Sequence, residues 1–158
     1  MNITVAVEGI EGIKHYLNGK AARIKEELFT LMQDTGLAIK AAARAAAPRG
    51  VTGNLRGRIG MRASQAKMGV VVKSAAPHTW LVEHGRSPGR MPPLTVRREG
   101  WGITPWAEAK GVDPFLIARA IGRKGTRAQP FITPAAERYL PGFEPQARAL
   151  VEQILTTE

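Results

Sequence analysis

The chain has 158 residues, the length of one ordinary domain, and 44% of them are hydrophobic, which excludes wholesale disorder. It contains no cysteine, so disulfides, thiolate nucleophiles and cysteine metal sites are excluded. No apolar run approaches the roughly 20 residues that cross a bilayer, and the N-terminal residues lack the features of a secretion signal. The net charge of +10 leaves two interpretations, a patch that binds nucleic acid or one that docks on acidic protein surfaces.

The N-terminal third predicts a strand followed by a long helix. Apolar and polar residues alternate over 2–9, which is typical of a half-buried strand. Apolar residues then recur every three, four or seven positions until Pro48, which cannot continue a helix. Gly19 and Gly36 are the weak points at which we expect any break in so long a helix. The expected apolar stripe is Ile13, Leu17, Ala21, Ile24, Leu28, Leu31 and Ala38.

The middle of the chain predicts a hairpin and a basic loop. Residues 48–62 form a loop that leads into a strand, and 67–75, with three consecutive valines, pair with it as a second strand. Residues 86–98 are rich in proline and glycine, which excludes a helix or central strand and predicts a protruding basic loop. Between them, 78–86 is expected to be a turn. Its apolar residues are expected to pack beside the hairpin: Trp80, Leu81 and Val82.

The C-terminal third predicts helices. Thr-Pro or Asp-Pro pairs, the start signal of a polar N-cap followed by proline, open 104–111, 113–125 and 133–140. The segment 143–157 closes the chain as an amphipathic helix with an apolar stripe at Leu150, Val151, Ile154 and Leu155. The expected fold class is α+β. A small antiparallel sheet is packed by one long N-terminal helix and several C-terminal helices, in one domain over 1–158.

The segment HTWLVEHGR, residues 78–86, suggests a metal site because it holds two histidines and a glutamate. His78 and His84 are six residues apart, which places them on different faces of a helix or on the order of 20 Å apart along a strand. Unless the segment folds sharply back, one ion cannot bind both histidines. No serine lies in a nucleophile elbow, and no glycine loop is built for phosphate. We therefore expect no enzyme, no metal and no cofactor; a small hydrolase using His84 and Glu83 is kept as a third reading.

Three segments together resemble a known family: AAPRGVTGNLRGRI (46–59), HTWLVEHGR (78–86) and AIGRKGTRAQPFITPAAE (120–137). Their order and spacing are similar to those of the tailed-bacteriophage tail-completion family, also called neck, head–tail joining or minor tail proteins. Thr79-Trp80 and Arg86 depart from the family pattern. The residues that match the pattern are Pro48, Thr52, Gly53, Leu55, Arg56, Glu83, Gly85, Gly125, Pro130 and Phe131.

The resemblance implies a structural virion protein, made in the host cytoplasm, that forms a ring at the head-proximal end of a phage tail. The implied partners are further copies of itself, in a ring expected to be a hexamer, and the connector or head-closure, tail-terminator or tail-tube proteins. Genomic DNA is a passing contact, and no membrane is implied. A ring subunit presents two different patches to its neighbours. The expected interface residues are basic: Arg49, Arg58, Arg86, Arg90, Arg97 and Arg98. The alternative function is a basic nucleic-acid-binding module.

Separate structural predictions concern Gly53, Glu83 and Phe131. Gly53 is expected to allow a turn with positive φ. Glu83 is the only acidic residue between Asp34 and Glu99, so we expect it to pair with an arginine, Arg56 in its own chain or one in a neighbouring subunit. Phe131 is expected to anchor the last helix in the core rather than to contact another subunit.

Overall fold

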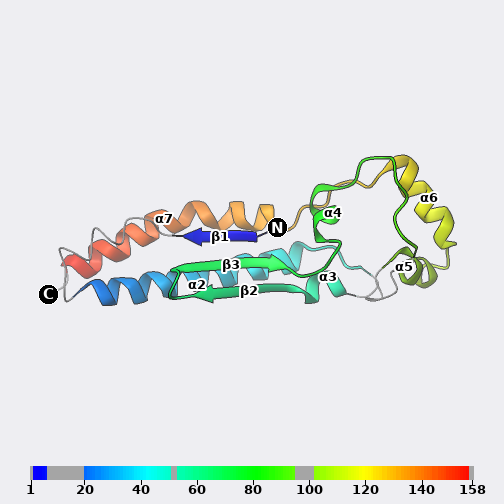
Figure 1. Ribbon diagram of the computed structural model, residues 1–158. Helices are drawn as coiled ribbons and strands as arrows, with labels where there is room; N and C mark the ends of the chain where they lie inside the picture. The colour runs from blue at the N-terminus through cyan, green and yellow to red at the C-terminus, as the bar shows by residue number, and fades with distance from the viewer. Residues whose placement is uncertain (1, 7–19, 51–52, 95–101, 157–158) are drawn as a thin grey trace. The chain divides into compact units, whose positions relative to one another are not determined.

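The structure is a computed structural model that describes residues 2–6, 20–50, 53–94 and 102–156, with only the backbone given for 2–6 (Figure 1). The described residues form helices and a small antiparallel sheet, which confirms the α+β class. The strands are β1 (Asn2–Ala6), β2 (Ile59–Ser64) and β3 (Gly69–Ser74). The helices are α2 (Ala21–Ala46), α3 (Asn54–Gly57), α4 (Thr79–His84), α5 (Ile103–Ala109), α6 (Pro114–Lys124) and α7 (Thr133–Thr156).

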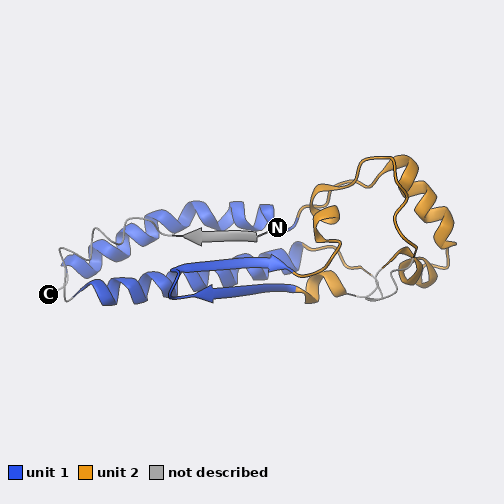
Figure 2. Cartoon of the chain, in the orientation of Figure 1, with its two compact units in different colours: residues 1–46, 59–74, 131–158 blue, residues 47–58, 75–130 orange. Residues whose placement is uncertain are grey.

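The chain divides into two compact units (Figure 2). Unit 1 comprises Met1–Ala46, Ile59–Ser74 and Phe131–Glu158, and it holds the sheet, α2 and α7. Unit 2 comprises Ala47–Arg58 and Ala75–Pro130, and it holds the four short helices α3 to α6. Each unit is assembled from segments far apart in the sequence. The single domain over residues 1–158 stays a prediction.

The sheet of unit 1 has the order β1-β3-β2, and both pairings are antiparallel. Ile59 pairs with Ser74 and Ser64 with Gly69, so the predicted hairpin is confirmed. β1 pairs along the other edge of β3, with Val5 opposite Val70. The predicted first strand is thus confirmed for residues 2–6, and its last three residues lie outside the described part of the chain.

The long helix is confirmed as α2, although its predicted residues before position 20 lie outside the described chain. Its buried stripe continues from Leu28 to Met32 and Ile39, whereas Leu31 and Ala38 are only half-buried. The predicted stripe was wrong at these two positions because a helix of 3.6 residues per turn carries the face of residues 24 and 28 on to 32. The buried residues are Ile24, Leu28, Met32, Gly36, Ile39 and Ala43.

Gly36 does not break α2. It is buried, and a Cβ atom built on it would lie 2.5 Å from Val70 Cγ1 and 2.8 Å from Met61 Sδ. The missing side chain is therefore what lets α2 lie close against the hairpin at this point. Met61 and Met68 border the small core that Met32 and Val70 form there.

The C-terminal segment is one helix, α7, so the prediction of separate helices over 133–140 and 143–157 was wrong. Pro141 and Pro145 lie inside it. An interior proline costs about 3 kcal/mol or more in helix hydrogen bonding and sterics. Packing on unit 1 offsets that cost, because Leu140 and Phe143, on either side of Pro141, both pack against the core of Met32 and Val70. A second cluster follows, in which Ala147, Leu150, Val151 and Ile154 pack with Ile24 and Leu28. The predicted stripe was wrong at Leu155, which is exposed.

Of the two N-caps predicted for helices of unit 2, one is confirmed and one is wrong. Asp113 caps α6 as predicted: its carboxylate accepts hydrogen bonds from the backbone amides of Phe115 (2.7 Å) and Leu116 (3.1 Å). Thr104 was predicted to cap α5, but this helix begins one residue earlier, after Gly102. The Thr104 hydroxyl instead donates to the carbonyl oxygen of Leu94 at 2.9 Å, a tertiary bond that competes with the capping role.

Candidate interaction site

The first of the three resembling segments forms a single helical turn, α3, in unit 2. Gly53 precedes it with φ of +61°, which confirms the predicted positive φ. Leu55 is buried, and the Nε of Arg56 donates to the carbonyl oxygen of Ala47 at 2.6 Å, which ties the turn to the chain just after α2. Pro48 is half-buried, and the matching Thr52 lies outside the described residues.

The second segment forms a short helix, α4, and not the turn that was predicted. Thr79 and Glu83 are buried on one face, four residues apart, while Trp80 and His84 lie on the exposed face with the same spacing. Trp80 is 59% exposed, so the prediction that it packs beside the hairpin was wrong; Leu81 and Val82 are half-buried. Six residues give no sustained periodicity, which is why the sequence did not reveal the helix.

Glu83 is the one charged side chain in the buried set of described residues, at 3% exposed. A buried carboxylate is stable only where hydrogen bonds or opposite charges compensate for its lost hydration. No buried polar side-chain atom in the described part of the chain lacks a hydrogen-bond partner. The specific pairing of Glu83 with Arg56 stays a prediction, and both residues belong to unit 2.

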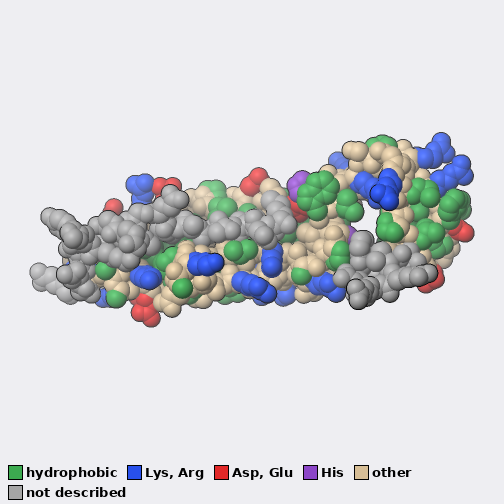
Figure 3. All heavy atoms as spheres, in the orientation of Figure 1, with side chains coloured by type: hydrophobic (Ala, Val, Ile, Leu, Met, Phe, Trp, Pro, Cys, Tyr) green, Lys and Arg blue, Asp and Glu red, His purple; other side chains and the backbone are tan. Residues whose placement is uncertain are grey.

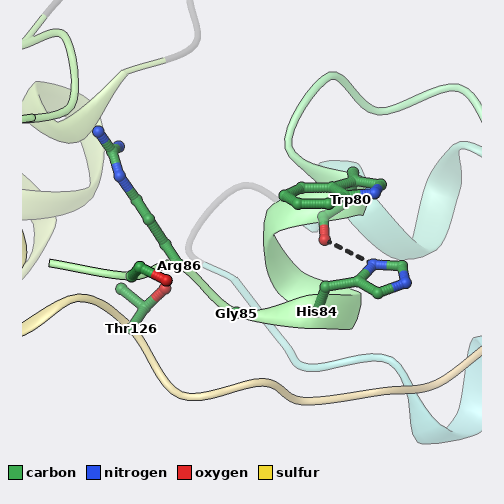
Figure 4. A pocket seen from close by; sticks show the side chains of 6 residues that line it. Trp80, His84, Gly85, Arg86 and Thr126 are labelled. Carbon is green, nitrogen blue, oxygen red and sulfur yellow. Dashed lines mark hydrogen bonds between the residues drawn. The ribbon is translucent and has the colours of Figure 1, made fainter. Parts of the chain in front are cut away.

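The second and third segments meet in unit 2 through a pair of backbone hydrogen bonds. The amide of Arg86 donates to the Thr126 oxygen at 2.9 Å, and the amide of Thr126 donates back to the Arg86 oxygen at 2.8 Å (Figure 4). The amide of Gln129 also donates to the Val82 oxygen at 2.8 Å. Residues some 40 positions apart in the sequence are therefore held as a short two-stranded bridge, directly after α4.

Two glycines make this bridge sterically feasible. Gly85 has φ of +75°, and a Cβ atom on it would lie 2.7 Å from the Thr126 oxygen and 2.8 Å from the Ala128 nitrogen. Gly125 has φ of +72°, and a Cβ atom on it would collide with the Arg86 oxygen. Both positions combine a left-handed backbone with backbone contact, so each admits only glycine without strain. The structure thus gives a physical role to Gly85, which the sequence marked only by resemblance, while Gly125 also ends α6, as the sequence predicts.

An open pocket of about 400 Å³ lies at this bridge, lined by Trp80, His84, Gly85, Arg86, Ser87 and Thr126. The rings of Trp80 and His84 stack with centroids 4.9 Å apart, and His84 Nδ1 lies 3.2 Å from the Trp80 carbonyl oxygen. An acceptor there requires the proton on Nδ1, which leaves Nε2 of His84 as the outward-facing acceptor. Figure 4 shows the Arg86 side chain extending away from the two rings. The pocket offers an aromatic surface with a few polar groups.

The two histidines of the segment have different surroundings. His78 is half-buried at the start of α4, and burial, followed by the nearby Arg58 cation, lowers its pKa below the ordinary value of 6.5. His84 is exposed on the outer face of the same helix. Among the described residues no group of three or more His, Cys, Asp or Glu side chains is gathered as metal ligands would be.

The candidate interface arginines are distributed over unit 2. Arg49, Arg58 and Arg90 are exposed, whereas Arg86 is half-buried and its guanidinium donates to the Arg90 carbonyl oxygen within the loop. The amide of Gly89 donates to the Gly122 oxygen at 2.7 Å, so the described part of the predicted loop 86–98 is fastened to the end of α6. The remaining candidates, Arg97 and Arg98, lie outside the described residues, and protrusion of the loop stays a prediction.

Basic charge and exposed hydrophobic side chains are concentrated in unit 2. Its sequence contains twelve Lys and Arg against four Asp and Glu, a net charge of +8 out of the whole chain's +10. Large hydrophobic side chains are also exposed there, and Figure 3 shows hydrophobic and basic side chains together over α5 and α6. Seven of the nine large hydrophobic residues that are exposed in the described chain belong to unit 2: Trp80, Met91, Leu94, Trp106, Val112, Phe115 and Leu116.

The apolar part of this surface was not predicted from the sequence. The signal was available in α6, where Phe115, Leu116 and Ile117 follow one another and therefore cannot all face the core of a small helical unit. Charge alone drew attention to the arginines. The structure shows that basic and apolar residues share one surface, which is the usual composition of a protein–protein contact.

No family model, curated protein or solved structure matches this chain. The tail-completion resemblance therefore rests on the three segments alone and stays a prediction. In the described part of the chain, no helix combines the length and the apolar character needed to cross a bilayer.

Proposed function

We propose that this chain is a structural subunit of a tailed-bacteriophage virion that forms a ring at the head-proximal end of the tail. One observation carries the proposal. Gly85 and Gly125, which belong to two different resembling segments, meet at one backbone bridge in unit 2 and are both required by its geometry. Their meeting joins two of the three segments on which the resemblance rests.

The surface of unit 2 supports a role in assembly. Seven exposed large hydrophobic residues and a net charge of +8 on one unit are more than a solvated surface needs, and such patches mark interaction sites. Unit 1 has the opposite character, with its large apolar side chains mostly gathered between α2, α7 and the hairpin. A chain with a self-sufficient core unit and a second unit rich in contact groups suits a subunit of a larger assembly.

The proposal is tested in the virion and in solution. If it is correct, mass spectrometry of purified particles carrying this gene detects the chain, and electron microscopy of the purified protein at high concentration shows closed rings. A protein that is absent from particles and monomeric at every concentration contradicts the proposal. Gly125→Ala serves as a variant expected to lose assembly because the bridge in unit 2 is disrupted, and Gly111→Ala, at a glycine with open space around it, is its matched control.

The concentration of charge in unit 2 also favours a second candidate, a nucleic-acid-binding module. This function requires affinity for a DNA duplex that falls linearly with the logarithm of salt concentration, because bound phosphates release counterions. Fluorescence anisotropy with a labelled duplex between about 50 and 200 mM NaCl measures this slope. The absence of binding at the lowest salt concentration would remove this candidate, while rings without DNA affinity would favour the structural role.

A further inference from the structure

The outer face of α6 combines apolar and basic residues without internal partners in the described structure. Ala118 and Gly122 are the buried residues of this helix, so the opposite face looks outward. Leu116, in its first turn, is 58% exposed. Arg119 and Arg123, four residues apart on the same outer face, form no hydrogen bond or ion pair within the described chain. This face is therefore apolar at its N-terminal end and positive at its C-terminal end.

The outer face of α2 has the matching composition in the reverse order. The buried stripe from Ile24 to Ala43 leaves the opposite side of this helix to solvent. Leu37, 48% exposed, and the exposed Ala41 lie toward its C-terminal end. Asp34 and Glu27 are exposed toward its N-terminal end, and no Lys or Arg is exposed between residues 26 and 34. Between residues 27 and 41 this face is negative first and apolar second, and the exposed Arg23 and Arg44 lie beyond that stretch at its two ends.

We propose that the outer face of α6 binds the outer face of α2 on a second copy of the chain, with the two helices antiparallel. The partner is chosen because apolar and charged residues have the same spacing on the two helices. Leu116 and Arg119 are three residues apart, and so are Leu37 and Asp34, which is about 4.5 Å along each helix axis. When Leu116 faces Leu37 of the second copy, Arg119 therefore faces its Asp34. Every other pair then follows from this register.

The same register places complementary residues toward the C-terminal end of α6. Arg123 falls opposite Thr30, with the carboxylate of Glu27 one turn further along and within reach of a long arginine side chain. Apolar residues thus meet apolar residues, and both arginines meet carboxylates.

The contact is heterologous, because it joins two different surfaces of identical chains. Such a contact repeats from copy to copy and produces either a closed ring or an open filament. The inference rests on the proposed function only for the closure into a ring; the pairing itself is argued from the two faces. Because the arginines and carboxylates are exposed, the attraction is screened by salt, and association should weaken as the salt concentration rises.

The test uses the full chain and two charge-reversal variants. The first carries Arg119→Glu and Arg123→Glu, and the second carries Glu27→Lys and Asp34→Lys. Each variant alone brings like charges together, so we expect its self-association, measured by analytical ultracentrifugation, to weaken on the order of 100-fold. An equimolar mixture restores association, because each variant's altered face then meets the oppositely altered face of the other. A chain with all four substitutions also self-associates.

Matched controls separate the proposed contact from general charge effects. Arg62→Glu with Lys67→Glu reverses two exposed charges on the hairpin and should leave association unchanged. All the substituted side chains are exposed, so thermal unfolding followed by circular dichroism should agree among the variants. Two results would overturn the inference: association that ignores the reversals at α6 and α2, or a mixture of the two variants that stays dissociated. Rings that persist in either case would contradict the α6–α2 contact but not the proposed function. Absence of the chain from virions would contradict the proposed function, and the mixture of variants would still test the contact.

Discussion

Gly36→Ala should destabilise unit 1, although it replaces glycine inside a helix. Helix propensity alone favours alanine by about 1 kcal/mol. The added Cβ, however, would lie 2.5 Å from Val70 Cγ1 and 2.8 Å from Met61 Sδ, distances that force a neighbour to move. Met61 can yield because it is flexible and half-buried, but Val70 is stiff at χ1 and 1% exposed on the central strand.

The two effects can be set against each other. Overpacking a close-packed core typically costs about 1–3 kcal/mol. Subtracting the propensity gain, we expect Gly36→Ala to lower the free energy of unfolding by about 1 kcal/mol. Gly142→Ala is the matched control, because Gly142 lies inside α7 and the nearest atom to its built Cβ is Gln146 Nε2 at an ordinary 3.6 Å. This control should raise the free energy of unfolding by up to about 1 kcal/mol.

Urea unfolding followed by circular dichroism gives both values. Val70→Ala provides a double-mutant cycle: alone it should cost about 2 kcal/mol through lost methyl groups and a cavity. Combined with Gly36→Ala, the new methyl occupies part of that cavity, so the double variant should be more stable than the sum of the single effects by about 1 kcal/mol. A stabilising Gly36→Ala, or additivity within about 0.3 kcal/mol, would show that α2 does not approach the hairpin as described.

Three further perturbations address unit 2. Gly125→Ala places a side chain on a backbone oxygen at φ of +72° and should cost at least about 2 kcal/mol more in unfolding free energy than Gly111→Ala, which has φ of +65° but open space; chemical denaturation compares the two directly. Asp113→Ala removes both capping hydrogen bonds of α6 and should cost about 1 kcal/mol, most of which Asp113→Asn should recover in the same assay. His78 has a pKa below 6.5 in the folded chain, mainly through burial and also through Arg58, so the unfolded chain binds its proton more tightly. Stability should therefore be fully present above about pH 6.5 and fall as pH drops through the folded pKa of His78; unfolding of His78→Gln across this window should show a weaker pH dependence, and equal slopes would contradict the assignment.

The parts of the fold that were predicted correctly depend on local signals. The valine strand, its hairpin partner and the Asp113-Pro114 start of α6 are each determined by residues within a few positions of one another. The errors arose where distant residues decide the outcome. α7 continues through Pro141 because Leu140 and Phe143 both find the same core, and no local rule records that core. Phe131, which was expected to be buried rather than exposed at an interface, is indeed fully buried.

Glycine shows most clearly what local reasoning leaves undetermined. Gly36, Gly53 and Gly125 all looked like breaks or turns in the sequence. Gly53 is a turn residue, with positive φ and open space around it. Gly36 sits inside an unbroken helix, and Gly125 closes a bridge to a segment about 40 residues away, because in both cases another part of the chain occupies the space of a side chain. A glycine in the sequence therefore shows that a side chain is absent. It does not show whether the reason is a turn, a close contact of a helix or a backbone bridge.

The exposed apolar residues of α6 were overlooked in the sequence, whereas the arginines were not. Charge is visible in a sequence wherever it lies, because a charged side chain is exposed by default. An apolar residue is assumed to be buried, and only the structure shows that Phe115 and Leu116 are exposed. The residues that suggest a binding surface are thus the apolar side chains that the fold leaves exposed. In unit 2 those residues occur together with exposed arginines, and the partner that we propose supplies both an apolar contact and negative charge.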